Sequence, residues 1–149
     1  MKKNKIIILG ILVIISFLII GCKKDNITGN TIVDTSDAVT ISLASLSNTV
    51  DFYEYDDNGV KISYFVVLGS DGKARTAFDA CDVCGGYKGY RQQGNDIVCN
   101  NCGKVFRIDG LGSKNKGYGC WPSFLPHEIE GDNLIIQISD IKQGRNRFV

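Results

Sequence analysis

The sequence CDVCGGYKGYRQQGNDIVCNNCG, residues 81–103, contains two Cys-x-x-Cys pairs separated by fourteen residues, with a glycine after the second pair. Each pair places two sulfurs on one tight turn at a separation that suits a single metal. Gly103 suits such a turn, because the chain that folds back over the metal often needs a positive φ. Two turns together supply four thiolates in the tetrahedron that zinc and mononuclear iron prefer. The stretch therefore predicts a loop-rich, ribbon-like metal-binding subdomain.

A fifth cysteine, Cys120, lies downstream in GYGCWPSFLPHEIE. It is either a buried small hydrophobe beside Trp121 or a further ligand of the metal or cluster. Closed structural zinc needs only four ligands, so a fifth thiol in a glycine-flanked loop favours iron. His127, the only histidine, is expected to be a surface or core residue, and Asp79 is expected to be solvated. The candidate ligands are Cys81, Cys84, Cys99, Cys102 and Cys120.

The segments around the cysteines predict a mainly β fold with an antiparallel meander before the metal-binding subdomain. Residues 39–43 alternate apolar and polar side chains, which is typical of a half-buried strand. The other strand candidates are rich in β-branched and aromatic residues or form short apolar runs. They are residues 52–55, 60–68, 73–78, 104–108 and 134–138.

Two turn signals lie within the predicted meander. Asn58-Gly59 and Asp71-Gly72 both fit tight hairpin turns, because these residue types tolerate positive φ angles. No segment after the N-terminal leader sustains the period of an amphipathic helix, so no helix is predicted there.

The N-terminus has the anatomy of an export signal. A basic start, MKKNK, precedes an apolar run over residues 6–20, which is shorter than the about 20 residues of a comfortable membrane span. Residues 19–22, IIGC, resemble a bacterial lipobox, which predicts lipidation at Cys22; an uncleaved anchor helix is the alternative. Either arrangement holds the chain at a membrane, on its extracytoplasmic face. The predicted organisation is a signal segment at 1–21, a polar tether at 22–38 and one domain at 39–149.

The charge balance narrows the range of partners. The formal net charge of the chain is +1, and removal of residues 1–21 leaves 14 Lys and Arg against 16 Asp and Glu. This composition lacks the strongly basic character of a nucleic-acid-binding protein. The predicted partners are the membrane, through the N-terminal lipid or anchor, and a membrane redox or iron-transport protein.

The cysteine region resembles a known family. The sequence CDVCGGYKGYRQQGNDIVCNNCGKVF, followed by a glycine-rich loop and GYGCWP, resembles the FtrD-like family of membrane iron-sulfur containing proteins over about residues 60 to 140. The resemblance implies that the five cysteines after the leader bind iron or an iron–sulfur cluster. It also implies an association with iron-uptake systems and electron handling outside the cytoplasmic membrane. Larger members have several membrane-spanning segments before this domain, and many have Asn-Pro where this chain has Trp121-Pro122.

The sequence thus predicts a membrane-anchored iron or iron–sulfur binding protein that carries electrons. The sequence shows no acid–base pair that would indicate an enzyme. Two alternatives stay open. One is a zinc-ribbon-stabilised binding module, in which the metal supplies only folding energy. The other is an extracytoplasmic thiol–disulfide oxidoreductase, although such enzymes place an exposed Cys-x-x-Cys at a helix N-terminus, and no such helix is predicted.

Overall fold

The computed structural model describes residues 32–35, 37–84, 87–117 and 119–149, and within them eleven strands form three antiparallel sheets. The outer sheet has the order β1 (Ile32–Thr35), β2 (Ala38–Ser42), β11 (Asn133–Gln137) and β10 (Glu128–Glu130). The middle sheet has the order β3 (Asp51–Asp57), β4 (Val60–Leu68), β5 (Ala74–Cys81) and β9 (Pro122–Phe124). The cysteine sheet has the order β6 (Tyr90–Gln93), β7 (Asp96–Cys99) and β8 (Val105–Arg107).

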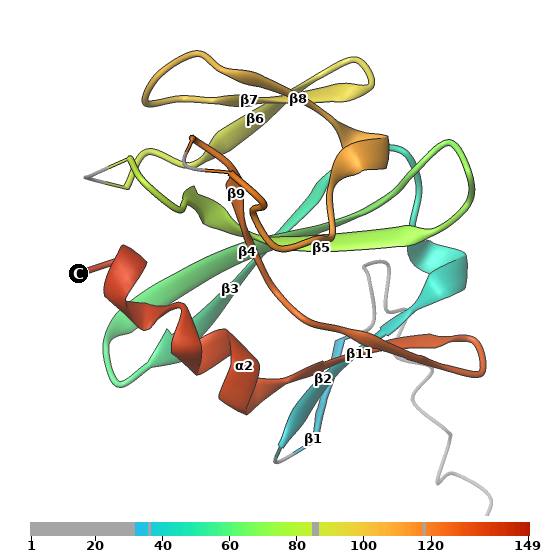
Figure 1. Cartoon of the computed structure of the whole chain (residues 1–149). Helices are drawn as coiled ribbons and strands as arrows, with labels where there is room; N and C mark the ends of the chain where they lie inside the picture. Colours follow the sequence, from blue (N-terminus) through green and yellow to red (C-terminus); the bar gives the residue numbers. More distant parts are fainter. Residues whose placement is uncertain (1–31, 36, 85–86, 118) are drawn as a thin grey trace, which may run out of the picture.

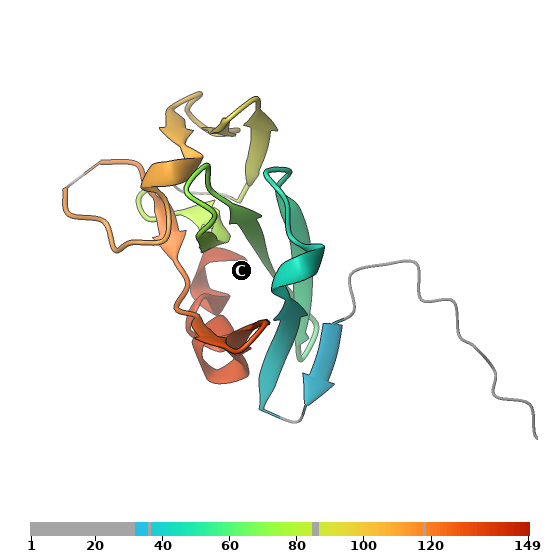
Figure 2. The same ribbon diagram turned by 90° about the vertical axis from the view of Figure 1, so that its right-hand side faces the viewer.

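The middle sheet separates two hydrophobic cores, and the three sheets lie one above the other in both ribbon views (Figures 1 and 2). The first core, between the outer and middle sheets, consists of Val39, Ile41, Leu46, Tyr53, Ile62, Tyr64, Val66, Phe78, Ala80, Leu125, Leu134, Ile136, Ile138 and Ile141. The second core, between the middle and cysteine sheets, consists of Val50, Phe65, Val67, Ala77, Tyr90, Ile97, Cys99, Phe106, Ile108 and Leu111.

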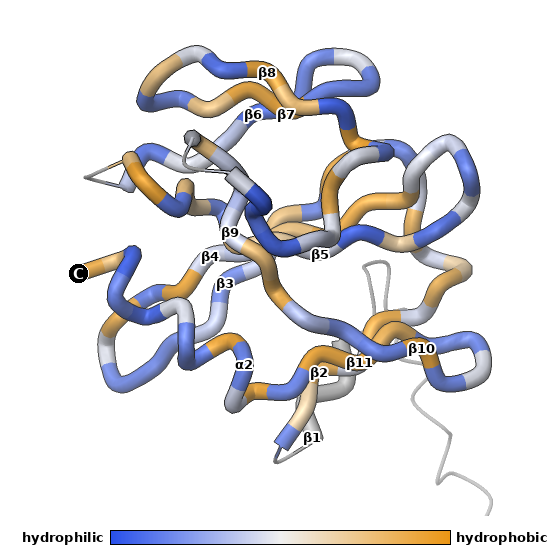
Figure 3. The backbone as a smooth tube through the Cα atoms, in the orientation of Figure 1, coloured by the Kyte–Doolittle hydropathy of each residue, from blue (hydrophilic) through white to orange (hydrophobic). Residues whose placement is uncertain are grey.

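Strand β4 explains how one sheet serves both cores. All residues from Ile62 to Val67 are buried, because successive side chains point to opposite faces and both faces are covered. Tyr64 faces the first core, whereas Phe65 faces the second. In the outer sheet, strand β11 is hydrophobic, whereas the turn between β10 and β11 is hydrophilic (Figure 3).

The predicted mainly β fold with an antiparallel meander is confirmed, and the strand expected at 60–68 has those bounds. Asn58 and Gly59 have φ angles of 52° and 84° in the β3–β4 turn, as the turn signal predicts. The Asp71-Gly72 turn belongs to a longer loop, because the β4–β5 register closes at Leu68 and Ala74.

The structure corrects one expectation from the sequence and adds a strand to another segment. Helix α2 (Ile138–Gln143) follows β11 directly, although no helix was predicted. It is only six residues long, so its two buried residues, Ile138 and Ile141, are too few to show a period. Strand β1 lies inside the segment predicted as a tether, so the outer sheet begins before residue 39.

The predicted signal segment, the lipidation site Cys22 and the first part of the tether lie outside the described residues. Across the part of the chain that the structure does describe, no helix has the length and apolar character needed to span a membrane.

Candidate metal centre

The first Cys-x-x-Cys turn begins at the end of β5. Cys81 is the last residue of that strand and pairs with Pro122 at the start of β9. The Asp82 N–H donates to the Trp121 carbonyl at 3.0 Å. The pairing of β5 with β9 places Cys120, the residue before Trp121, beside the first turn. The middle sheet therefore brings the fifth cysteine to the site.

The second turn closes the β7–β8 hairpin of the cysteine sheet. The Gly103 N–H donates to the Cys99 carbonyl at 2.8 Å, and the Cys99 N–H donates to the Lys104 carbonyl at 2.9 Å. Gly103 has a φ of 74°, the left-handed backbone expected at this position. The turn therefore presents Cys99 and Cys102 from one rigid hairpin.

The two turns and Cys120 bring five sulfurs together. The sulfurs of Cys84, Cys99, Cys102 and Cys120 all lie within 4.8 Å of one another. Cys81 is outside this group of four, but its sulfur is 3.0 Å from the Cys120 sulfur. The Cys120 sulfur is also 3.5 Å from that of Cys102 and 3.8 Å from that of Cys84. Cys120 is thus a central member of the cluster.

The cluster runs from the interior to the surface. Cys99 is 1% exposed and belongs to the second core, whereas Cys102 is exposed. Cys81, Cys84 and Cys120 are half-buried. One edge of the site therefore reaches solvent through Cys102, while the opposite side is sealed.

The thiols of the cluster differ in acidity. For Cys81, burial opposes ionisation, but hydrogen bonds from Cys120 and from the Val83 and Cys84 amides outweigh it and lower the pKa to about 7. The hydrogen bond with Cys81 raises the pKa of Cys84 to about 12, and burial raises the pKa of Cys120. The Lys104 amide lowers the pKa of Cys102.

This pattern is what crowded thiols produce, because neighbouring thiolates repel and a retained proton relieves the repulsion. A bound cation relieves it more completely, since thiolates are the metal-binding form.

The donor set fits a mononuclear metal. In a tetrahedral site with metal–sulfur bonds of about 2.3 Å, the sulfurs are about 3.8 Å apart. The group of four, with every separation within 4.8 Å, is close to that arrangement. A multinuclear cluster would place several irons between its cysteines and spread their sulfurs further. A sulfur-only tetrahedral set is typical of zinc or iron.

A buried hydroxyl lies within electrostatic range of the sulfurs. Tyr90 belongs to the second core, and its Oη has no hydrogen-bond partner among the described residues. Burial, together with the charges of Cys81, Cys120 and Cys99, raises the pKa of Tyr90 well above its usual value. A neutral phenol is a hydrogen-bond donor, so this O–H suits an anionic sulfur of the metal centre.

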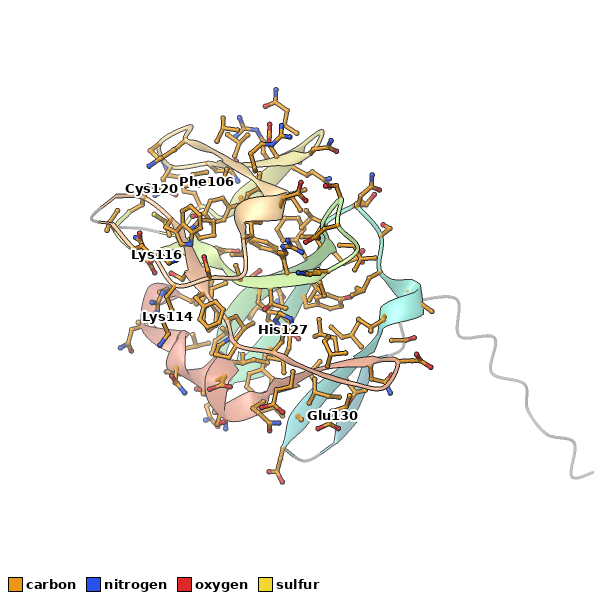
Figure 4. The ribbon with its side chains drawn as sticks, turned by 45° about the vertical axis from the view of Figure 1, so that its right-hand side comes forward. Phe106, Lys114, Lys116, Cys120, His127 and Glu130 are labelled. Atoms are coloured by element: carbon orange, nitrogen blue, oxygen red, sulfur yellow. The ribbon has the colours of Figure 1, made fainter. Side chains whose placement is uncertain are left out.

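Aromatic rings cover the buried side of the site. Phe106 contacts Trp121 edge-on with ring centroids 5.5 Å apart, and Tyr90 contacts Phe106 at 6.2 Å. The Trp121 Nε1–H donates to the Ser113 carbonyl at 3.0 Å, which fixes the indole and the loop before Cys120. Figure 4 shows Phe106 next to Cys120. This apolar cover limits water access to the sulfurs.

Asp79 is the residue that sequence reasoning misjudged. It is 6% exposed rather than solvated, and burial raises its pKa. Its carboxylate accepts the Tyr90 N–H at 2.6 Å and the Tyr87 O–H at 2.7 Å, and it tethers the chain between the first turn and β6. Gly89 is required there, because a Cβ would lie only 2.4 Å from the carboxylate. In the sequence, the signal for burial is that Asp79 lies between the apolar residues Phe78 and Ala80.

His127 is not part of the sulfur cluster. Its Nδ1 is 2.8 Å from the Thr76 Oγ1, and the Thr76 hydroxyl donates to the Leu125 carbonyl at 2.6 Å. The Thr76 oxygen therefore accepts a hydrogen from Nδ1. Burial lowers the pKa of His127, which favours the neutral ring. The expectation that the lone histidine is structural agrees with this placement (Figure 4).

A cavity of about 470 Å³ adjoins the first turn. Its walls include three of the cysteines together with Lys88 and Arg147. The Arg147 guanidinium lies 3.6 Å from the Asp82 carboxylate, so the acid and base on this wall neutralise one another.

The fold and the site define a β-rich protein with a cysteine-only candidate metal centre between two sheets. Residues 45–148, which are 104 of the 149 residues, match the family model described as "Membrane iron-sulfur containing protein FtrD-like". The chain belongs to this FtrD-like family, and the resemblance noted from the sequence is confirmed. Neither a curated protein nor a solved structure matches the chain.

Proposed function

We propose that this protein is a membrane-anchored, extracytoplasmic electron carrier in which four thiolates hold one iron. The observation that carries the proposal is the convergence of Cys84, Cys99, Cys102 and Cys120 within 4.8 Å. The family description, which names iron–sulfur proteins of membranes, supports iron as the metal. The sequence resemblance to proteins of iron-uptake systems extends the proposal to that process.

Each part of the site has a defined role in this proposal. Bound iron supplies a one-electron change of valence. The second turn holds two sulfurs on a rigid hairpin, and Cys120 joins them from the middle sheet. Phe106 and Trp121 exclude water from the buried side. The exposed sulfur of Cys102 provides the edge at which an electron enters or leaves.

Membrane attachment is the second part of the proposal. The lipobox-like residues 19–22 direct lipidation of Cys22. The polar segment that follows lets the domain reach a partner in the membrane. Acyl chains add about 0.8 kcal/mol of membrane affinity per buried CH₂.

A zinc-stabilised binding module is the alternative with a specific observation in its favour. Four thiolates without an open position are also the usual ligands of structural zinc. Cys81, whose sulfur is 3.0 Å from that of Cys120, lies outside the group of four in either case, so the preference for iron rests on the family description.

Anaerobic purification of the full-length chain, with visible absorption spectra and metal counting, tests the proposal. We expect one iron per chain and visible charge-transfer bands that bleach on reduction. The Cys102→Ser variant should lose the iron, whereas Cys81→Ser should keep it, because Cys81 lies outside the group of four.

Three outcomes would contradict this account. A colourless protein with one zinc would favour the binding module. A metal-free protein with paired thiols would favour the thiol–disulfide oxidoreductase. Loss of iron from Cys81→Ser but not from Cys120→Ser would assign the ligand role to Cys81.

A further inference from the structure

Charge is distributed unevenly between the cysteine region and the rest of the chain. Residues 81–121 contain six Lys and Arg against three Asp and Glu. Residues 32–80 and 122–149 together contain six against twelve. The net charge of −3 over residues 32–149 therefore hides a basic region that carries the candidate metal centre.

Four exposed lysines belong to this region, and we call them the basic face. They are Lys88, Lys104, Lys114 and Lys116. Lys88 lines the cavity shared with Cys84 and Cys99. Lys104 follows the second turn, and its ammonium is 5.5 Å from the centre of the Phe106 ring.

Lys114 and Lys116 lie in the loop that leads to Cys120. The Asn115 side-chain N–H donates to the Gly119 carbonyl at 2.9 Å, which folds the loop back toward the cysteine. Figure 4 shows both lysines on the same side of the molecule as Cys120, whereas Glu130 is at the opposite end.

The basic face is not neutralised within the described residues. None of its four lysines forms an ion pair there, whereas Lys61, outside the face, pairs with Glu54 at 3.1 Å. Four unpaired ammonium groups exceed the charge of a tetrathiolate iron site, which is −1 or −2. The face therefore keeps a positive potential around the exposed edge at Cys102.

Apolar side chains are exposed at the first turn, whose Cys84 sulfur lies within 4.8 Å of the Cys102 sulfur. Val83, in the first turn, is 59% exposed, and Tyr87 is 47% exposed. Both line the cavity next to Cys84. An apolar centre with a charged rim is typical of a protein interface, and the rim charges set the orientation and the rate of encounter.

We propose that the basic face is the docking surface for an acidic electron-transfer protein, which approaches the metal through Cys102. This inference rests on the proposed electron-transfer function and adds the chemistry of the partner. Docking brings an acidic rim against the four lysines and an apolar patch against Val83 and Tyr87. One electron then passes between the two metal or flavin centres, and no bond is formed or broken.

Two probe proteins of opposite charge test the proposal by stopped-flow kinetics on the full-length, iron-loaded chain in a non-ionic detergent. A reduced acidic flavodoxin reduces the oxidised protein, and a basic cytochrome c oxidises the reduced protein. We expect the flavodoxin rate to fall as ionic strength rises. The double variant Lys114→Gln/Lys116→Gln should slow the flavodoxin reaction about tenfold at low salt and should not slow the cytochrome c reaction.

A matched control removes two exposed lysines outside the face, Lys61→Gln/Lys73→Gln, and should leave both rates near their wild-type values. Equal slowing by the control pair would mean that net charge alone acts, and would overturn the proposal. The proposal would also be overturned if the rates of electron exchange with both probes did not change with salt or with the Lys114→Gln/Lys116→Gln substitutions. The proposed electron-transfer function would still stand in that case. A chain without redox-active iron would overturn both.

Anionic lipid is the other candidate occupant. Binding to phosphatidylserine vesicles is compared with binding to phosphatidylcholine vesicles for the wild-type chain and the double variant. Loss of the phosphatidylserine preference in Lys114→Gln/Lys116→Gln, with an unchanged flavodoxin rate, would assign the face to the membrane and overturn the proposal.

Discussion

The two cores of this protein are completed by different forces. The hydrophobic cluster of the first core consists of aliphatic and aromatic side chains, mostly from the outer and middle sheets and helix α2, and holds no cysteine among the described residues. The second core contains Cys99 among its buried residues, and Cys81, Cys84, Cys120 and Trp121 pack against it half-buried. Burial of apolar surface suffices for the first core, whereas the second ends in a group of crowded thiols that the proposed metal would hold together.

Metal removal should separate the two cores most strongly. Chelation of the iron should leave the thiols to repel one another and loosen the cysteine sheet, because metal-binding energy is also folding energy in such sites. Hydrogen exchange should become at least about tenfold faster in β6, β7 and β8, while β4 and β11 stay protected. Equal loss of protection in all three sheets would show that the cores fold as one unit.

Truncation of the first core should have the opposite signature. Ile41 is fully buried, and Ile41→Ala should lower the free energy of unfolding by about 2 to 5 kcal/mol. Denaturant unfolding measures this loss, and the visible bands of the iron should be unchanged in the folded variant. Altered bands would mean that the middle sheet transmits strain from one core to the other.

Asp79 connects the middle sheet to the chain that enters β6. Asp79→Ala should lower the free energy of unfolding by about 2 kcal/mol, because it leaves the Tyr90 amide without its buried acceptor. Denaturant unfolding of the metal-loaded protein measures the change. Asp132→Ala, which removes an exposed carboxylate in the β10–β11 turn, is the control and should be close to neutral. An unchanged free energy of unfolding in Asp79→Ala would show that this contact does not stabilise the fold.

The smallest expected effect concerns the Tyr90 hydroxyl. A hydrogen bond from this hydroxyl to a sulfur of the iron-loaded site would stabilise the more electron-rich, reduced state, so Tyr90→Phe should lower the reduction potential. A hydrogen bond worth about 0.5 to 1.5 kcal/mol corresponds to about 20 to 60 mV for one electron. Spectroelectrochemical titration of both proteins measures the shift. An unchanged potential with unchanged bands would show that this hydroxyl does not reach the sulfurs.

Much of the fold could be predicted from local sequence signals. The apolar run at 60–68 and the Asn58-Gly59 turn fix the centre of the meander, since propensity and turn chemistry act over a few residues. Helix α2 was not predicted, because a helix of six residues is too short to show the hydrophobic period of an amphipathic helix. Strands β6 and β7 lie within the cysteine stretch, where their pairing depends on the hairpin rather than on strong strand propensity.

The site was predicted as a set of residues but not as an arrangement. Spacing predicted that the four cysteines of the two Cys-x-x-Cys pairs lie close together, and the family resemblance added Cys120; the structure brings all five sulfurs together. Spacing could not show that Cys120 belongs to the group of four while Cys81 lies beside it, because the β5–β9 pairing that places Cys120 is long-range. The burial of Asp79 depends on the same tertiary packing.

The central claim is that Cys84, Cys99, Cys102 and Cys120 hold a single iron. X-ray absorption at the iron edge of the anaerobically purified, full-length protein tests it most directly. The account predicts one iron per chain with four sulfurs at about 2.3 Å and no neighbouring iron. A signal from a second iron, or nitrogen and oxygen in place of sulfur, would contradict it.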